Sequence, residues 1–290
     1  MEQITTQPSA EMLAALQSGF TEHSAAVDAA GSHVAYRAGG SRGPVVVLLH
    51  GISSGAASWL PCASLLAASA RVIAWDAPGY GNSTPLPQAQ PKAADYAARL
   101  EGLLRALGVR PDLIVGHSLG ALMASAYLAD AAPDLLPRSL LLLSPAQGYG
   151  AAGKEDKSRE VEQQRLDALA SLGVAGLAER GPQRLLSQSA TPDARTWVRW
   201  NMARLREAGY RQAVSMLCRD DIAGYLARRP PHVPVAVACG ALDVVTTPLA
   251  SGDLAAQFGL PFSLLPGAGH VCYVDRPNGA AALIRSVLGD

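Results

Sequence analysis

Ser118 stands between two glycines in the stretch Gly116-His117-Ser118-Leu119-Gly120, and this G-x-S-x-G spacing is typical of a serine nucleophile. A short apolar run, residues 111–115, precedes the motif, and small helix-compatible residues, 121–128, follow it. Between a strand and a helix, the motif predicts a strained turn that exposes the serine, with glycines that let strand and helix approach closely. The alternative is a glycine-bounded loop with an ordinary serine, and the motif alone leaves that alternative open.

Two further residues supply the groups that a serine nucleophile needs. A serine hydroxyl is a weak nucleophile until a base removes its proton, and the base in turn needs a carboxylate to orient it. His270 lies just past the last predicted strand, and Asp243 lies just past the strand before it. Both are therefore expected at the carboxyl edge of the sheet, where the sites of open α/β sheets assemble. The chain order Ser118, Asp243, His270 is the nucleophile–acid–base order of this architecture and predicts a catalytic triad.

The negative charge that develops on the attacked carbonyl oxygen needs hydrogen-bond donors, and the loss of one costs about 3–4 kcal/mol. We expect one donor to be the backbone N–H of Leu119, which follows the nucleophile and starts the predicted helix. The second donor is expected in the loop 50–54, at the N–H of Ile52 or, as a second choice, of Ser53. These groups would form an oxyanion hole.

Other candidate residues have structural interpretations. His117 is expected to point into the structure, and His50 to brace the loop that follows it. Asp76 is expected to accept hydrogen bonds from the amides of its own turn, and Cys272 to fill space beside the site. His232 lies among prolines and is expected to be exposed.

The four cysteines, at positions 62, 218, 239 and 272, show no C-x-x-C spacing. Because no cluster of Cys, His or carboxylate residues has metal-ligand spacing and no glycine-rich phosphate loop is present, we expect neither a metal nor a cofactor. Scattered cysteines are typical of a reduced protein, and residues 1–6 lack the features of a secretory signal. Both observations favour a cytoplasmic location.

The charge balance bears on the partners of the chain. Its 290 residues include 24 Lys and Arg and 24 Asp and Glu, which gives a formal net charge of +0. Without a net positive charge, the protein has no overall electrostatic attraction for nucleic acid or for an anionic membrane. The expected partner is therefore a small-molecule substrate. No run of about 18 apolar residues is found, which argues against a membrane-spanning helix. The sequence does not indicate an oligomeric state.

Predicted strands and helices alternate along most of the chain. After a predicted peripheral helix at 8–20, the continuous apolar run 44–49 is typical of a strand buried on both faces. The alternation predicts an α/β fold with a mostly parallel, doubly wound sheet and helices on both faces. The predicted strands are 24–28, 33–38, 44–49, 71–75, 113–115, 138–143, 234–239 and 260–265.

The alternation stops between residues 147 and 228, where helical patterns such as 154–172 and 194–208 occur without a strand-like run. We interpret this stretch as an inserted helical cap, because a structureless linker of this length would be unusual in a compact domain. The expected organisation is a first part of the core at 1–146, the cap at 147–228 and a second part of the core at 229–290. One or two cap arginines turned inward could hold a substrate carboxylate, although each by itself is more simply interpreted as solvated. These arginines are Arg180, Arg184, Arg195, Arg199, Arg204, Arg206, Arg211 and Arg219.

With these motifs the chain resembles the α/β-hydrolase superfamily across most of its length. The matching stretches are 49–51, 76–83, the serine motif, 240–243 with Thr247-Pro248, and 267–270 with 275–277. Within the superfamily it is similar to capped hydrolases of aromatic degradation, namely 3-oxoadipate enol-lactonases and meta-cleavage product hydrolases. The stretches 50–54 and 209–221 are similar to the enol-lactonase pattern.

The resemblance implies a serine hydrolase that cleaves an ester or lactone of a small substrate, with or without a carboxylate, through an acyl-enzyme. A carbon–carbon bond hydrolase acting on meta-cleavage ring-fission products is the alternative with the same triad. A non-catalytic binding protein with the same fold is the alternative from another class. The triad does not exclude acyl transfer to an acceptor other than water.

Overall fold

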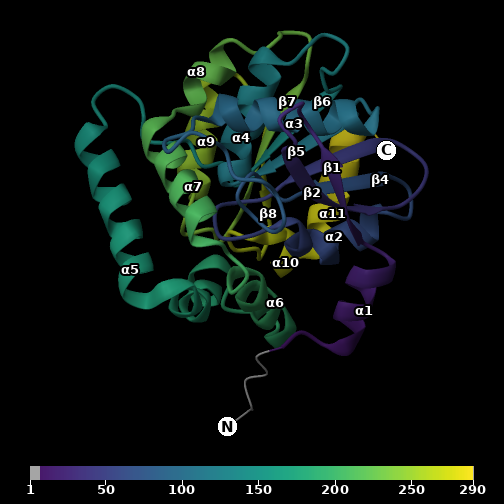
Figure 1. Ribbon diagram of the computed structural model, residues 1–290, viewed down its shortest axis with the longest axis horizontal. Helices are drawn as coiled ribbons and strands as arrows, with labels where there is room; N and C mark the ends of the chain where they lie inside the picture. Colours follow the sequence, from purple (N-terminus) through teal and green to yellow (C-terminus); the bar gives the residue numbers. More distant parts are fainter. Residues whose placement is uncertain (1–6, 290) are drawn as a thin grey trace.

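The computed structural model describes residues 7–289, whose centre is one eight-stranded sheet with the strand order β1-β2-β4-β3-β5-β6-β7-β8 (Figure 1). The pairs β1–β2 and β2–β4 are antiparallel, and the other pairs are parallel. The mostly parallel α/β fold that the sequence predicted is therefore confirmed. The strands are β1 Thr21–Ala26, β2 His33–Gly39, β3 Val45–Leu49, β4 Arg71–Trp75, β5 Leu113–His117, β6 Ser139–Leu143, β7 Val235–Gly240 and β8 Phe262–Leu265.

Helices cover both faces of the sheet and divide the core into two apolar clusters. Along β3, Val47 and Leu49 join the cluster on one face, while Val46 and Leu48 join the cluster on the other. This alternation, with both faces covered, explains why β3 is an unbroken apolar run in the sequence. The first face is covered by α3 Ala93–Leu107, α4 Leu119–Asp130 and α9 Pro248–Gln257, and the second by α1 Ala10–Ser18, α2 Leu60–Leu66 and α11 Pro277–Leu288.

Between β6 and β7 the chain forms helices without any strand, as the sequence predicted. They are α5 Glu155–Leu185, α6 Pro192–Met202, α7 Glu207–Arg219 and α8 Ile222–Ala227, and Figure 1 shows α5 and α6 lying outside the sheet and its covering helices. The predicted helix at 154–172 continues to Leu185 through a kink at Gly173, whose φ is 61°. The single helix predicted at 194–208 is wrong, because α6 ends at Met202 and α7 begins at Glu207.

Two short helices complete the fold: the 3₁₀ helix η1 Ala56–Trp59 after β3 and α10 Cys272–Asp275 after β8. No helix within residues 7–289 is long and apolar enough to cross a membrane. The sequence features of residues 1–6 lie outside the described residues.

Candidate active site

Ser118 lies in the tight turn between β5 and α4, with φ 52° and ψ −117°. A non-glycine residue rarely adopts a positive φ, and such strain persists only where the surrounding structure enforces it. The flanking glycines provide that enforcement. A Cβ on Gly116 would lie 2.5 Å from the Gly120 carbonyl oxygen, and a Cβ on Gly120 would lie 2.5 Å from the Leu49 carbonyl oxygen. The strand-to-helix turn expected from the motif is present.

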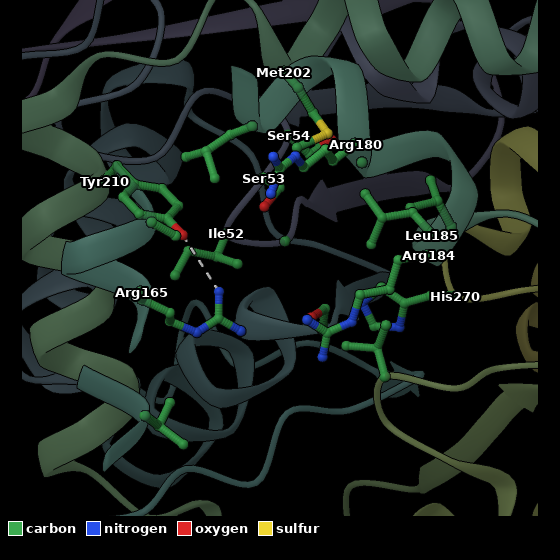
Figure 2. Close-up of a pocket in the computed structure, with 18 of the residues that line it drawn as sticks. Ile52, Ser53, Ser54, Arg165, Arg180, Arg184, Leu185, Met202, Tyr210 and His270 are labelled. Carbon is green, nitrogen blue, oxygen red and sulfur yellow. Dashed lines mark hydrogen bonds between the residues drawn. The ribbon is translucent and has the colours of Figure 1, made fainter. Parts of the chain in front are cut away.

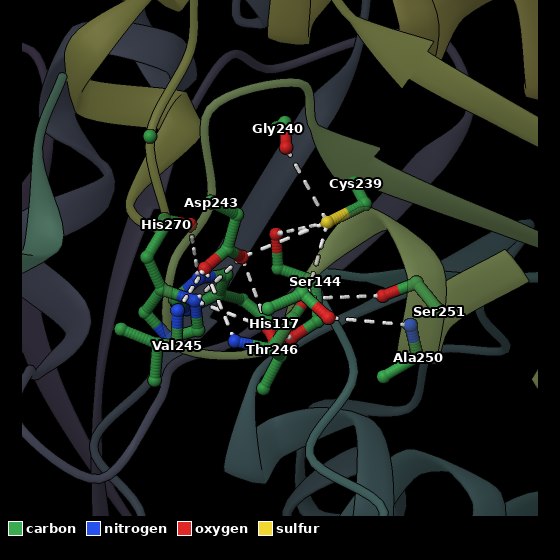
Figure 3. Close-up of polar contacts among 12 residues, drawn as sticks. His117, Ser144, Cys239, Gly240, Asp243, Val245, Thr246, Ala250, Ser251 and His270 are labelled. Atoms are coloured by element: carbon green, nitrogen blue, oxygen red, sulfur yellow. Dashed lines mark hydrogen bonds and ion pairs between the residues drawn. The ribbon is translucent and has the colours of Figure 1, made fainter.

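His270 follows β8 and Asp243 follows β7, at the same edge of the sheet where Ser118 follows β5. Figure 3 shows the Asp243 and His270 side chains facing each other. The His270 Nδ1 lies 2.8 Å from Asp243 Oδ2, so the imidazole donates a hydrogen bond to the carboxylate when Nδ1 carries the proton. Ser118 and His270 line one cavity, which brings all three predicted residues together. Within residues 7–289, no hydrogen bond joins Ser118 Oγ to the ring, and such contacts often tighten only when substrate binds.

The Asp243 carboxylate is held by several donors besides His270. Its Oδ1 accepts hydrogen bonds from the amides of Val245, at 2.7 Å, and Thr246, at 3.1 Å. Its Oδ2 also accepts one from the Thr246 hydroxyl at 3.0 Å. Burial opposes the charge on Asp243, but hydrogen bonding to His270, the charge of His270 and the Val245 amide hold its pKa well below the usual range. Asp243 is therefore an anion at neutral pH, suited to orienting an imidazole.

The loop after β3, residues 50–54, passes close to Ser118, since a Cβ on Gly51 would lie 3.0 Å from the Ser118 Cβ. His50 braces it as expected: its Nδ1 donates to the Gly51 carbonyl at 2.8 Å, and its Nε2 accepts from the Ala77 amide at 3.0 Å. These partners assign the neutral tautomer. Burial also lowers the pKa of His50 to about 4, so the ring is neutral at physiological pH.

Ile52 and Leu119 are the residues whose amides the sequence predicts as oxyanion donors. Ile52 lines the cavity, and its carbonyl accepts a hydrogen bond from the Tyr80 hydroxyl at 2.9 Å, which fixes the loop. Leu119 is the first residue of α4, whose initial N–H groups have no intrahelical acceptor. In the part of the chain that the structure describes, neither amide donates to a backbone carbonyl. Neither amide is therefore occupied by a backbone acceptor within the described residues.

His117 points into the structure, as the sequence predicted, and it contacts the loop of His270. Its Nε2 donates a hydrogen bond to the His270 carbonyl at 2.9 Å, and its ring packs edge-on against Tyr273. Burial and the neighbouring His270 lower the pKa of His117 to about 3, so the ring stays neutral. This contact between the serine turn and the carbonyl of His270 was not predicted from the sequence, because it joins residues 153 positions apart.

Three further expectations have mixed outcomes. The prediction for Asp76 is wrong: its Oδ1 accepts from the Ala56 amide at 2.8 Å, at the start of η1, rather than from its own turn. Cys272 is fully buried, and burial raises the pKa of its thiol well above the usual range, which fits a space-filling role. His232 is exposed, as predicted.

The cavity beside Ser118 has a volume of about 390 Å³ and lies between the carboxyl edge of the sheet and the helices α5, α6 and α7 (Figure 2). Its apolar lining includes Leu177, Leu185 and Met202. Its cationic lining consists of Lys157, Arg165, Arg180 and Arg184, all from α5. Arg180 and Arg184 were among the eight arginines considered from the sequence, whereas Lys157 and Arg165 were missed, because helical spacing alone does not show which face of α5 meets the core. Within residues 7–289, no group of three or more His, Cys, Asp or Glu side chains is arranged to hold a metal ion.

A sequence model of the alpha/beta hydrolase family matches residues 46–283 of this chain. RutD of Shigella flexneri, which is named as a carbamate hydrolase, is 28% identical over 257 residues, a stretch that covers 83% of this chain and 90% of RutD. These two findings agree over most of the sheet and the helices between β6 and β7.

Solved structures give the same result for the fold. The enol-lactonase from Burkholderia xenovorans LB400 superposes with a TM-score of 0.79 at 22% identity, over 92% of this chain and 100% of that one. A thermophilic esterase from Thermogutta terrifontis superposes with a TM-score of 0.77, also at 22% identity, over 93% of this chain and 98% of that one. At such identities the likeness concerns the fold, which both neighbours share with this chain.

Proposed function

This chain belongs to the alpha/beta hydrolase family, and on that basis we propose that it is a serine hydrolase that cleaves an ester or a lactone through an acyl-enzyme. One observation carries the proposal: Ser118 and His270 line one cavity, while the Asp243 carboxylate lies within hydrogen-bond distance of Nδ1 of the His270 imidazole. The strained backbone at Ser118 also supports the proposal. A tight turn between strand and helix presents the hydroxyl of a nucleophilic serine, and such a costly backbone conformation is typical of functional sites.

In this mechanism Ser118 Oγ attacks the carbonyl carbon, and its proton passes to Nε2 of His270. Asp243 keeps the imidazole in the tautomer with the proton on Nδ1 and stabilises the imidazolium that forms. The imidazolium then protonates the leaving oxygen as the carbon–oxygen bond breaks, which yields the acyl-enzyme. Water, deprotonated by His270, attacks the acyl carbon, and Ser118 recovers its proton as the acid product leaves. The Ile52 and Leu119 amides hold the oxyanion both when the acyl-enzyme forms and when water hydrolyses it. Neither amide donates to a backbone carbonyl within residues 7–289, which supports this role.

We further propose that residues 147–228 act as a cap that sets the substrate, between core parts at 1–146 and 229–290. The helix α5 from this segment supplies much of the cavity wall opposite the sheet edge, which supports that division. The names of the relatives, a carbamate hydrolase and an enol-lactonase, point to a small acyl compound, and the enol-lactonase agrees with the resemblance found in the sequence.

The test is covalent labelling followed by turnover. An active-site-directed fluorophosphonate is expected to label the native protein at one serine, and Ser118→Ala is expected to abolish both labelling and the hydrolysis of aryl esters and lactones. Ser125→Ala is the matched control. Ser125 is a buried serine of α4, the helix that begins directly after Ser118, and its hydroxyl has no hydrogen-bond partner within the described residues. Labelling that persists in Ser118→Ala refutes the mechanism.

The compounds tested as substrates should include yellow meta-cleavage ring-fission products besides the aryl esters and lactones. Bleaching of these compounds by a protein that leaves every ester and lactone intact would identify the carbon–carbon hydrolase instead. Ligand binding without any turnover, unchanged in Ser118→Ala, would identify a binding protein.

A further inference from the structure

The cavity beside Ser118 has cationic walls and no acidic residue among its lining side chains. Four cations from α5 reach it, namely Lys157, Arg165, Arg180 and Arg184, while no Asp or Glu within residues 7–289 lines it. In a chain with equal numbers of basic and acidic residues, this local imbalance is not a consequence of composition. A cleft lined by one sign of charge raises the local concentration of ligands of the opposite sign.

These cations differ in how they are neutralised. Lys157 forms an ion pair with Glu160 at 2.8 Å, and other arginines of the helical segment are paired, such as Arg199 with Glu179 at 3.1 Å. Arg180 and Arg184, by contrast, make no hydrogen bond or ion pair within residues 7–289, and the only hydrogen bond of Arg165 there is a long one, 3.4 Å, to the Tyr210 hydroxyl. The cavity lining therefore includes three guanidinium groups that form no ion pair with a carboxylate of residues 7–289.

The kink of α5 at Gly173 lies between Arg165 and the two other arginines that line the cavity. Arg165 lies before the kink, and Arg180 and Arg184 lie after it, four residues apart and so on one face of the helix. Figure 2 shows Arg165 beside Tyr210 and Arg184 on the His270 side, both pointing into the cavity. Figure 2 shows Arg180 apart from Arg184, beside Met202 and Ser54, so we call Arg165 with Tyr210 the first pole and Arg184 alone the second pole. Apolar side chains, including Val161 and Leu177, also line the same cavity.

We propose that the substrate of this site carries two separate carboxylates, one bound at each pole, with its reacting carbonyl at Ser118. A guanidinium matches a carboxylate through two parallel N–H···O hydrogen bonds, so two poles suit two carboxylates better than one compact anion. The apolar lining suits the short carbon chain that joins the carboxylates. This assignment rests on the proposed function, since it takes Ser118 as the group that attacks the substrate.

The first experiment compares three 4-nitrophenyl esters with the same leaving group: the acetate, the monoester of glutaric acid and a monoester of tricarballylic acid, with zero, one and two free carboxylates. We expect kcat/KM to rise about tenfold with each carboxylate, because charge-assisted hydrogen bonds at a partly exposed site contribute at the low end of their range. Arg165→Gln and Arg184→Gln are each expected to remove one of these tenfold steps, so that the ratio of kcat/KM between the tricarballylate ester and the acetate falls about tenfold in either variant.

The matched control is Arg159→Gln. Arg159 lies on the same helix but does not line the cavity and is paired with Asp156. Equal kcat/KM for the three esters, a preference that survives in both pole variants, or an equal loss in the control would overturn the proposal. A phosphate-bearing ester hydrolysed faster than the tricarballylate ester would also overturn it, because that result would identify one compact anion as the ligand.

A second experiment separates this inference from the proposed function. Tricarballylate binding to Ser118→Ala, measured by calorimetry, is expected to weaken about tenfold or more in the background of either pole variant. If fluorophosphonate labels Ser118 and the acetate is hydrolysed but tricarballylate does not bind, the two-carboxylate inference alone is wrong. If tricarballylate binds at both poles but Ser118 is never labelled, the hydrolase mechanism is wrong, and the poles then describe a binding site.

Discussion

Replacing Asp243 by Asn tests the geometry of the site most directly, because the substitution keeps the size of the side chain and changes one acceptor into a donor. The amide must choose which of its two ends faces His270. Two backbone amides, of Val245 and Thr246, donate to Asp243 Oδ1. Turning an N–H₂ group toward them would leave both partly buried donors unpaired, at about 1 kcal/mol or more each. The amide oxygen is therefore expected at the Oδ1 position, which places the N–H₂ group against His270.

A donor at that place selects the wrong tautomer of the imidazole. Nδ1 of His270 must then accept a hydrogen bond, so the proton resides on Nε2, and the ring presents a donor toward Ser118 rather than an acceptor. Loss of the correct tautomer in a serine–histidine–aspartate site lowers kcat by about 10⁴-fold. At 1.36 kcal/mol per factor of ten, this corresponds to about 5.4 kcal/mol of transition-state stabilisation.

The assay is hydrolysis of a 4-nitrophenyl ester together with the rate of fluorophosphonate labelling, both at neutral pH. Thr246→Val is the graded control, because it removes one neutral hydroxyl donor to Asp243 Oδ2 and leaves the carboxylate in place. It is expected to reduce kcat by about tenfold or less, the equivalent of a single hydrogen bond. If Asp243→Asn folds, as shown by a native-like circular dichroism spectrum at the assay temperature, and retains a kcat within tenfold of the native protein, the assigned role of Asp243 is wrong.

The same variant has a predicted pH dependence of stability. The pKa of Asp243 in the folded protein lies below its ordinary value of 3.8, so its charge stabilises the fold above that pH. This contribution disappears as the pH falls through the lower, folded-state pKa. The Tm difference between the native protein and Asp243→Asn is therefore expected to be largest near neutral pH and to narrow below pH 3.8. A difference that grows in acid would contradict the sign of the shift.

Two further predictions concern the turn at Ser118. Gly120→Ala places a Cβ 2.5 Å from the Leu49 carbonyl oxygen and is expected to cost about 1–3 kcal/mol, lowering Tm by several degrees. Gly224→Ala in α8, where a Cβ meets no atom within 4 Å, is expected to leave Tm unchanged or higher, and a fall equal to that of Gly120→Ala would disprove the steric explanation. His117→Phe keeps an aromatic ring but loses the hydrogen bond to the His270 carbonyl, so kcat is expected to fall about tenfold with KM unchanged. A change confined to KM in steady-state kinetics would show that His117 acts on the substrate and does not position His270.

Much of the fold was predictable because its signals are local. The run Val45–Leu49 is apolar at every position, since both faces of β3 are covered, and the alternation of such runs with helical patterns defines a mostly parallel sheet. The helices at 192–219 were less predictable. Gly209 looks like a break in the sequence, but it lies inside α7, where a Cβ would fall 2.1 Å from the Gly79 carbonyl oxygen. A glycine required by a distant contact cannot be distinguished locally from one required by a turn.

The sequence by itself determined the type of chemistry proposed here, because Ser118, Asp243 and His270 each follow a recognisable strand and the carboxyl ends of parallel strands share one edge. Only the tertiary structure decided what surrounds these residues. It shows that Asp76 bonds the start of η1, that His117 holds the His270 carbonyl, and that the kink at Gly173 turns Arg165 and Arg184 into one cavity. Each of these contacts joins residues from different elements or from the two halves of a bent helix, and neither residue spacing nor composition records how such segments pack.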